Sequence, residues 1–288
     1  MQILDGKKVS EDIKNEIAAE VAQMKANGEK VPHLAAIIVG NDGASLTYVG
    51  SKVKSCERVG FESTLIKMPS TTSETELLKK IKELNENDDI DGFIVQLPLP
   101  KQIDTQKIIE AIDPSKDVDG FHPENFGKMA LDMSTFIPAT PFGILELLER
   151  YGVETSGKHT VVIGRSHIVG RPMSILMGRK GFPGNSTVTL THSYTKNISQ
   201  ITTQADIIIT ALGVPNYLKA EMIKDDAVVI DVGINRVEKK NGYKIVGDVE
   251  FKSVVKKAKA ITPVPGGVGP VTIACLLNNT LKAFKNIN

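Results

Sequence analysis

The segment VVIGRSHIVGRPMSIL, residues 161–176, decides the fold of the second half of the chain. Its first residues are β-branched and apolar, which is typical of a strand buried on both faces of a parallel sheet. Gly164 ends this strand, and a helical pattern begins near Gly170. A tight turn at this point allows backbone N–H groups at the helix start to hold a pyrophosphate. The segment therefore predicts a strand, turn and helix that bind a nucleotide.

The rest of the chain repeats the alternation of strand and helix. In the second half, further β-branched strands are predicted at 186–192, 205–210 and 227–233. In the first half, apolar strands are predicted at 34–40, 61–68 and 91–100. Ser10 is expected to cap the first helix, and Asn241-Gly242 predicts a small hairpin. No internal repeat is visible, and the alternation predicts parallel α/β layers.

An irregular stretch between Asp113 and Pro141 interrupts the alternation and predicts a domain junction without regular elements. A last helix opens at Pro270, and its strong apolar stripe is expected to pack against the first domain. We therefore predict an α/β protein of two α/β domains with a cleft between them. Residues 1–140 plus 268–288 are expected to form one domain, and residues 141–267 a Rossmann-like domain with a mostly parallel sheet.

The composition excludes several classes of protein. The 288 residues are 41% apolar and 24% charged, with 35 Lys+Arg against 34 Asp+Glu. This balance is that of a globular protein and argues against nucleic-acid binding, which leaves a basic excess. No signal peptide and no run of about 18 apolar residues is present, so we expect no membrane segment and a cytoplasmic location. The two cysteines are expected to be buried, and scattered histidines predict no metal site.

The turn after Gly164 indicates which dinucleotide binds. Arg165-Ser166 replaces the middle glycine of the usual G-x-G-x-x-G pattern. An NAD site usually has an acid about 20 residues further on, at the end of the second strand, but here Ser193 follows that strand. A cation and a hydroxyl favour a 2′-phosphate, and therefore NADP. Arg171 is an alternative cation, and a pure packing role for the glycine turn stays open.

Polar residues of the first half gather at one predicted edge. Tyr48 and Lys52 are four residues apart on a helix and share a face. Gln96 ends a buried strand, and Asp117 and Asp119 follow in a later loop. Ligands of parallel sheets bind at the carboxyl ends of the strands, where we expect these residues to lie. The alternatives are an exposed lysine, a strand-end amide that satisfies the backbone, and aspartates that form a turn.

The glycine cluster PVPGGVGPVT, residues 263–272, precedes the last helix. Its prolines remove N–H donors, and no lysine follows the last glycine as it does in a P-loop. We therefore expect a rigid backbone wall beside a ligand rather than a phosphate cradle. The chain contains no G-x-S-x-G motif, which argues against the commonest serine hydrolases.

Seven motifs, in order and over nearly the whole chain, resemble the bifunctional methylenetetrahydrofolate dehydrogenase/methenyltetrahydrofolate cyclohydrolase family. They are ASLTYVGSK (44–52), VQLPLP (95–100), KDVDGFH (116–122), PATPFGI (138–144), VVIGRSHIVGRPM (161–173), DVGIN (231–235) and PVPGGVGPVT (263–272). The resemblance implies oxidation of 5,10-methylenetetrahydrofolate with NADP, then hydrolysis to 10-formyltetrahydrofolate. It also implies a homodimer formed largely through the cofactor domains. The alternatives are a dehydrogenase alone, an enzyme of this architecture with another substrate, and a non-catalytic NADP-binding protein.

The resemblance also implies roles for single residues. Lys52 would be the central catalytic residue, with Tyr48 against the folate, Gln96 hydrogen-bonded to Lys52, and Asp119 on the pterin ring. Further substrate contacts would come from Leu97, Pro265, Gly266 and Gly269. Cofactor contacts would come from Gly164, Arg165, Ser166, Ser193 and Ile234, with Arg165 and Ser193 at the 2′-phosphate.

Overall fold

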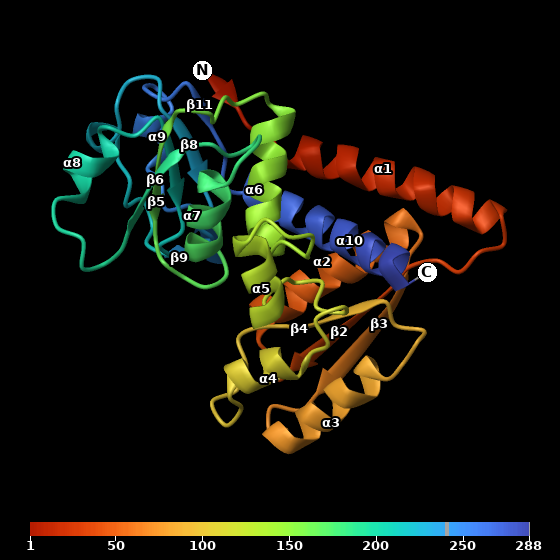
Figure 1. The fold of residues 1–288 in the computed structure, drawn as a ribbon. Helices are drawn as coiled ribbons and strands as arrows, with labels where there is room; N and C mark the ends of the chain where they lie inside the picture. The colour runs from red at the N-terminus through yellow and green to blue at the C-terminus, as the bar shows by residue number, and fades with distance from the viewer. Residues whose placement is uncertain (240–241, 288) are drawn as a thin grey trace. The chain divides into compact units, whose positions relative to one another are not determined.

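The chain divides into two compact units in the computed structural model, which describes residues 1–239 and 242–287 (Figure 1). Unit 1 comprises residues 1–10 and 140–272, and unit 2 comprises residues 11–139 and 273–288. Residues 1–10 therefore lie with the second α/β series, although the sequence placed them in the first domain. The reason is strand β1 (Gln2–Ile3), which pairs in parallel with β11 (Ala260–Ile261) of unit 1. The cleft expected between the domains stays a prediction.

Unit 1 is built on a six-stranded sheet in the order β1-β11-β8-β7-β5-β6. Every described pairing in it is parallel, so the predicted Rossmann-like parallel sheet is confirmed. Its remaining strands are β5 (His159–Ile163), β6 (Thr187–Thr191), β7 (Ile207–Thr210) and β8 (Val228–Asp231). The inner strands are almost wholly apolar and buried, because helices cover both faces of the sheet (Figure 1).

Short helices and one hairpin complete unit 1. The helices are α6 (Ala139–Arg150), α7 (Gly170–Gly178), α8 (Ile198–Thr202), the 3₁₀ helix η1 (Ala220–Met222) and α9 (Phe251–Val254). Strands β9 (Asn235–Lys239) and β10 (Gly242–Val246) pair antiparallel, as the sequence predicted. Gly242 already belongs to β10, opposite Lys239, and the predicted turn residue Asn241 lies outside the described residues.

Unit 2 holds a smaller parallel sheet in the order β3-β2-β4. The strands are β2 (His33–Val39), β3 (Glu62–Met68) and β4 (Gly92–Val95). Helices α3 (Glu74–Asn85) and α4 (Thr105–Ala111) pack their apolar residues onto one face of this sheet (Figure 1). Helix α2 (Gly43–Val59) contacts β2 and β3 and carries the residues discussed below.

Two long helices, α1 (Gly6–Ala26) and α10 (Val268–Ile287), each belong partly to unit 1 and partly to unit 2. Helix α1 starts before Ser10, so the predicted cap is wrong. The carboxylate of Asp5 accepts the first backbone N–H groups instead, and Ser10 donates to the carbonyl of Pro270. In unit 2, Asn279 of α10 donates to the carbonyls of Val118 and Ile137. Among the described helices, none is long and apolar enough to cross a membrane.

The junction stretch contains a helix that the sequence analysis did not predict, α5 (Pro123–Ala130). Pro123 occupies its first turn, and the ring of His122 accepts the N–H of Glu124 at 3.1 Å. Only eight residues long and interrupted by Gly127, α5 has too few apolar residues to show a helical period.

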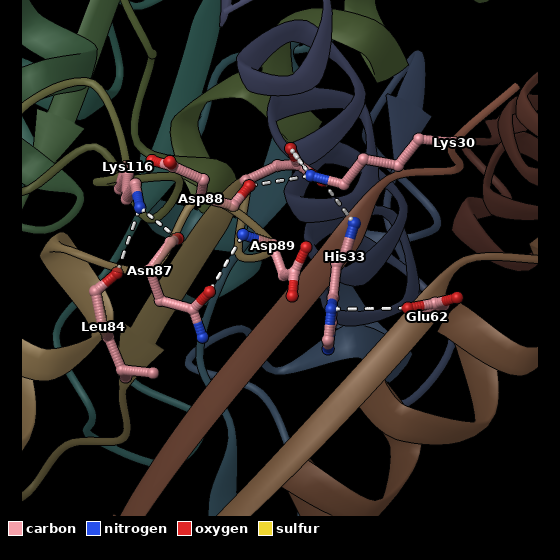
Figure 2. A network of polar contacts seen from close by, with 9 residues as sticks. Lys30, His33, Glu62, Leu84, Asn87, Asp88, Asp89 and Lys116 are labelled. Atoms are coloured by element: carbon pink, nitrogen blue, oxygen red, sulfur yellow. Dashed lines mark hydrogen bonds and ion pairs between the residues drawn. The ribbon is translucent and has the colours of Figure 1, made fainter.

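At the amino end of the unit 2 sheet, His33 of β2 contacts β3 and the residue before β4, and Figure 2 shows its ring beside Glu62 of β3. Its backbone N–H donates to the carboxylate of Asp91, directly before β4, at 2.7 Å. Its ring nitrogen Nε2 lies 2.8 Å from the hydroxyl of Thr64 on β3. Lys30 forms an ion pair with Asp91 at 3.0 Å.

Unit 1 repeats this arrangement with different residues. The backbone N–H of His159, which opens β5, donates to Asp206 directly before β7 at 2.7 Å. The ring of His159 lies 2.9 Å from the hydroxyl of Thr189 on β6, and Lys224 pairs with Asp206. In both units the histidine strand lies between the threonine strand on one side and the strand after the aspartate on the other. The two units therefore share a structural repeat that is invisible in the sequence pattern.

Candidate active site

Lys52 is buried in unit 2, with only 5% of its surface exposed. It lies on α2, whose first turn is capped by Asp42 through the N–H of Ser45 at 2.8 Å. Its ammonium nitrogen is 4.8 Å from the centre of the Tyr48 ring and 3.4 Å from Oε1 of Gln96. The alternative of a lysine on a solvated helix face is therefore wrong.

Gln96 is held so that its amide oxygen faces Lys52. It directly follows β4, and its backbone N–H donates to the carbonyl of Ile37 at 2.8 Å, which continues the sheet ladder. Its side-chain NH₂ donates to the carbonyl of Leu97 at 2.8 Å. With the nitrogen engaged by Leu97, the oxygen remains to accept from Lys52. The Leu97-Pro98 peptide, directly after Gln96, is cis.

The two candidate aspartates have different environments. The buried Asp117 accepts hydrogen bonds from the N–H groups of Phe121 and His122 and from the side chain of Asn125. It therefore has the turn-forming role that the sequence left open. The partly buried Asp119 accepts no hydrogen bond within the described residues, and its electrostatic partner is Lys52. The structure brings Asp119, Lys52, Tyr48 and Gln96 together and leaves Asp117 in the supporting loop.

Burial shifts the protonation of this group. Removal from water lowers the pKa of Lys52, although the charge of Asp119 opposes that effect. Burial raises the pKa of Asp119, with Lys52 opposing, and it also raises the pKa of Tyr48. The thiol of Cys56, one turn after Lys52, has its pKa raised to about 12 by burial. A neutral amine is thus more accessible at Lys52 than at an exposed lysine.

In unit 1, close packing requires glycine at two positions of the predicted nucleotide turn. Gly164 has a φ of 116°, and a Cβ there would lie 2.3 Å from the carbonyl oxygen of Ala211. A Cβ on Gly170 would lie 2.0 Å from the oxygen of Gly164. The hydroxyl of Ser166 accepts the N–H groups of Val169 and Gly170 at the start of α7. The turn and helix start are therefore fixed by their own contacts.

The two residues predicted at a 2′-phosphate are both exposed. Arg165 lies in the turn between β5 and α7, and Ser193 lies in the loop after β6. The guanidinium carbon of Arg165 lies 5.7 Å from the ring centre of Tyr194, next to Ser193. The alternative cation, Arg171, is exposed in the first turn of α7, and no ring or ion-pair contact of its side chain is found in the described part of the chain.

Two buried carboxylates, which the sequence analysis missed, hold the loops around this site. Asp231, at the end of β8, accepts the N–H groups of Gly233, Asp248 and Val249. Burial raises its pKa to about 6. Asp248 accepts the N–H groups of residues 212–214 and the side chain of Asn235. Their positions in D-V-G and G-D-V, each within two residues of a glycine, are the sequence signal that could have indicated them.

Ile234, between these carboxylates in sequence, is 64% exposed. Its terminal methyl lies 3.7 Å from the place of a Cβ on Gly269. The loop before Gly269 has a cis Val264-Pro265 peptide, and the carbonyl of Gly266 accepts the N–H of Lys7 at 3.1 Å. Ile234 and Gly269, two of the predicted contacts, thus lie close together in unit 1, and Pro265 and Gly266 belong to the loop before Gly269.

Comparison with known proteins assigns both halves of the chain. Residues 4–119 match the tetrahydrofolate dehydrogenase/cyclohydrolase catalytic domain, and residues 138–288 match the NAD(P)-binding domain of the same enzymes. The bifunctional protein FolD of Flavobacterium psychrophilum is 84% identical over 98% of this chain and 97% of its own length.

Solved structures agree with this assignment. The FolD methylenetetrahydrofolate dehydrogenase/cyclohydrolase of Campylobacter jejuni is 47% identical, with a TM-score of 0.95 over 100% of both chains. The dehydrogenase-cyclohydrolase of Trypanosoma brucei, solved with NADP and an inhibitor, is 38% identical, with a TM-score of 0.94 over 99% of this chain and 97% of that one. The chain described here belongs to the tetrahydrofolate dehydrogenase/cyclohydrolase family.

Proposed function

We infer that this chain oxidises 5,10-methylenetetrahydrofolate to 5,10-methenyltetrahydrofolate with NADP and then hydrolyses that product to 10-formyltetrahydrofolate. The observation that carries the inference is the buried Lys52, hydrogen-bonded to Gln96 and beside Tyr48 and Asp119. Relatives named as bifunctional enzymes, at up to 84% identity over nearly the full chain, support both activities.

The oxidation depends on alignment more than on a strong base. The hydride leaves the methylene carbon between N5 and N10 of the folate, and the nitrogen lone pairs stabilise the resulting amidinium. NADP, when bound, supplies the hydride acceptor. We propose that Tyr48 packs against the folate and that Lys52 and Gln96 fix its orientation. Leu97 would add an apolar contact at the end of β4.

The hydrolysis needs a base. We propose that the neutral amine of Lys52 takes a proton from the water that attacks the methenyl carbon. The new C–O bond forms and gives a neutral hydroxyl adduct. When the bond from that carbon to N5 breaks, Lys52 delivers its proton to N5, and the hydroxyl proton leaves to solvent as the formyl C=O forms, so one proton is released overall. Burial favours the neutral amine, and Gln96 directs it through the 3.4 Å contact.

The remaining site residues are proposed to contact the pterin, the rest of the folate and the cofactor. Asp119, which accepts no hydrogen bond in the described chain, is proposed to accept the amine and ring N–H of the pterin. On unit 1, Pro265, Gly266 and Gly269 would border the folate. Cofactor contacts are proposed at Gly164, Arg165, Ser166, Ser193 and Ile234. Unit 2 would thus carry the folate chemistry and unit 1 the NADP.

The assembly and location are also proposals. We propose a cytoplasmic homodimer formed largely through unit 1. Strand β6 lies at the edge of the six-stranded sheet, which leaves one side of that strand unpaired in the described chain. Sedimentation equilibrium tests the dimer, because one chain has a mass of 31.2 kDa and a dimer has twice that mass.

An absorbance assay tests the two activities on purified protein. With 5,10-methylenetetrahydrofolate and NADP, reduced cofactor should accumulate while methenyl-folate remains transient. Methenyl-folate that accumulates and decays only at its uncatalysed rate would show that the protein has the dehydrogenase activity but not the cyclohydrolase activity. The absence of reduced cofactor would contradict the proposed oxidation.

A further inference from the structure

Tyr194 is an exposed aromatic residue beside the proposed phosphate-binding residues of unit 1. Its side chain is 81% exposed and directly follows Ser193. The ring nevertheless has two partners. The Arg165 guanidinium carbon lies 5.7 Å from its centre, and the His192 ring lies 6.3 Å away in an edge arrangement. Both distances are within the range of favourable cation–π and aromatic pairs.

The loop that carries Tyr194 is fixed by its own hydrogen bonds. The N–H of His192 donates to the hydroxyl of Thr195 at 2.9 Å, and the N–H of Thr195 donates back to the carbonyl of His192 at 2.8 Å. The N–H of Tyr194 donates to Nδ1 of His192 at 3.3 Å. The backbone that carries the ring is therefore a closed turn.

The contact with Tyr194 leaves the hydrogen-bonding capacity of Arg165 intact. A guanidinium binds an aromatic ring through its flat face, while its five N–H donors point outward in its plane. Within residues 1–239 and 242–287, the Arg165 guanidinium has no ion pair, and the Tyr194 ring is its one recorded partner. The side chain thus lies beside the ring with its donors available.

We propose that Tyr194 is a positioning residue for the selection of NADP over NAD: its ring holds the Arg165 guanidinium where the 2′-phosphate binds. The proposal rests on the placement of Arg165 and Ser193 at that phosphate. A long exposed side chain must otherwise lose rotamer freedom when the ligand arrives, and prior ordering removes that cost from binding. Since NAD lacks the 2′-phosphate, its affinity does not depend on this ordering.

The test compares the dissociation constants of NADP and NAD by calorimetry on the full chain. Tyr194→Leu should weaken NADP binding about two- to fivefold, as expected for an exposed cation–π pair, and leave NAD binding unchanged. Tyr194→Phe keeps the ring and should bind NADP like the parent protein. Tyr243→Leu is the matched control, because Tyr243 is also exposed and holds Arg236 at 4.0 Å on the hairpin. This control should change neither constant.

A further variant separates this proposal from the one on which it rests. Arg165→Ala should weaken NADP binding more than Tyr194→Leu does. If Arg165→Ala weakens it and Tyr194→Leu does not, the positioning role is refuted while the phosphate assignment stands. Equal losses of NADP and NAD in Tyr194→Leu would also overturn the proposal, because the ring would then serve the shared part of the cofactors. No effect of Arg165→Ala would overturn both.

Discussion

Replacement of Lys52 by methionine should separate base catalysis from binding. Lys52→Met keeps an unbranched side chain of similar length in the buried space and removes the amine that lies 3.4 Å from Gln96. A positioned general base contributes about 10²- to 10⁴-fold to a rate, so cyclohydrolase turnover should fall by that factor. Dehydrogenase activity should also fall, because Lys52 and Gln96 orient the folate.

The stability of this variant should not explain its loss of activity. Burial lowers the pKa of Lys52 below 10.5, so protonation of this lysine opposes folding at neutral pH. Lys52→Met removes that opposition, but it also removes the charge that favours the Asp119 carboxylate; the two effects offset, and thermal unfolding at pH 7 should show a folded variant. The part of the change that comes from the lysine should be constant below the folded-state pKa of Lys52 and should disappear as the pH rises toward 10.5.

The assay follows the decay of methenyl-folate absorbance from pH 6 to pH 9, with the uncatalysed rate subtracted. The parent rate should rise with pH as the amine of Lys52 loses its proton, and the variant should lack this rise. Lys54→Met is the matched control, because Lys54 is exposed on the same helix. Cyclohydrolase activity of Lys52→Met within about tenfold of the parent would refute the base assignment.

Three further substitutions test the rest of the site. Asp119→Asn should raise the KM for the folate by about 10- to 100-fold, the loss of a charge-assisted hydrogen bond, and an unchanged KM would contradict the pterin role. Asp248 holds residues 212–214 through their N–H groups, so Asp248→Asn should loosen that loop and raise the KM for NADP while cyclohydrolase activity persists. Asp206→Asn, at the opposite end of the same sheet, should leave the KM for NADP unchanged. Equal effects of the two variants would refute the role of Asp248 in holding the cofactor loop. Gly164→Ala should lower the free energy of unfolding by more than about 1 kcal/mol, because its Cβ would clash with Ala211, whereas Gly127→Ala in α5 meets no atom and should raise it slightly. Calorimetric melting measures both changes, and an unchanged stability of Gly164→Ala would show that the turn is not constrained.

The strands could be predicted because burial leaves a direct mark on their composition. β5, β7 and β8 lie inside the sheet of unit 1, so nearly every position is apolar or β-branched. The helix α5 could not be predicted, because its eight residues are held by the cap at His122 and by tertiary contacts of Asn125 rather than by an apolar stripe. Likewise Asp5, not Ser10, caps α1, since the choice depends on where β1 ends.

The site could be predicted in part. The spacing of Tyr48 and Lys52 places them on one helix face, but their burial depends on what covers that face, which no local pattern reveals. The contact between Arg165 and Tyr194 joins residues that are 29 positions apart on neighbouring strand ends. The sequence identified Arg165 from its place in the turn, whereas Tyr194 had no motif to distinguish it.

Hydrogen bonding distinguishes the functional aspartate from the supporting ones. Asp91, Asp206 and Asp248 lie near strand ends and Asp117 lies in the loop before α5, and each accepts at least one backbone N–H group. Backbone donors fix the orientation of such a carboxylate and use part of its hydrogen-bonding capacity. Asp119 is partly buried and accepts no such donor in the described chain, and the charge near it is that of Lys52. A buried acceptor without a protein donor is costly, and a pterin that brings N–H donors would remove that cost, which is why we assign substrate binding to Asp119.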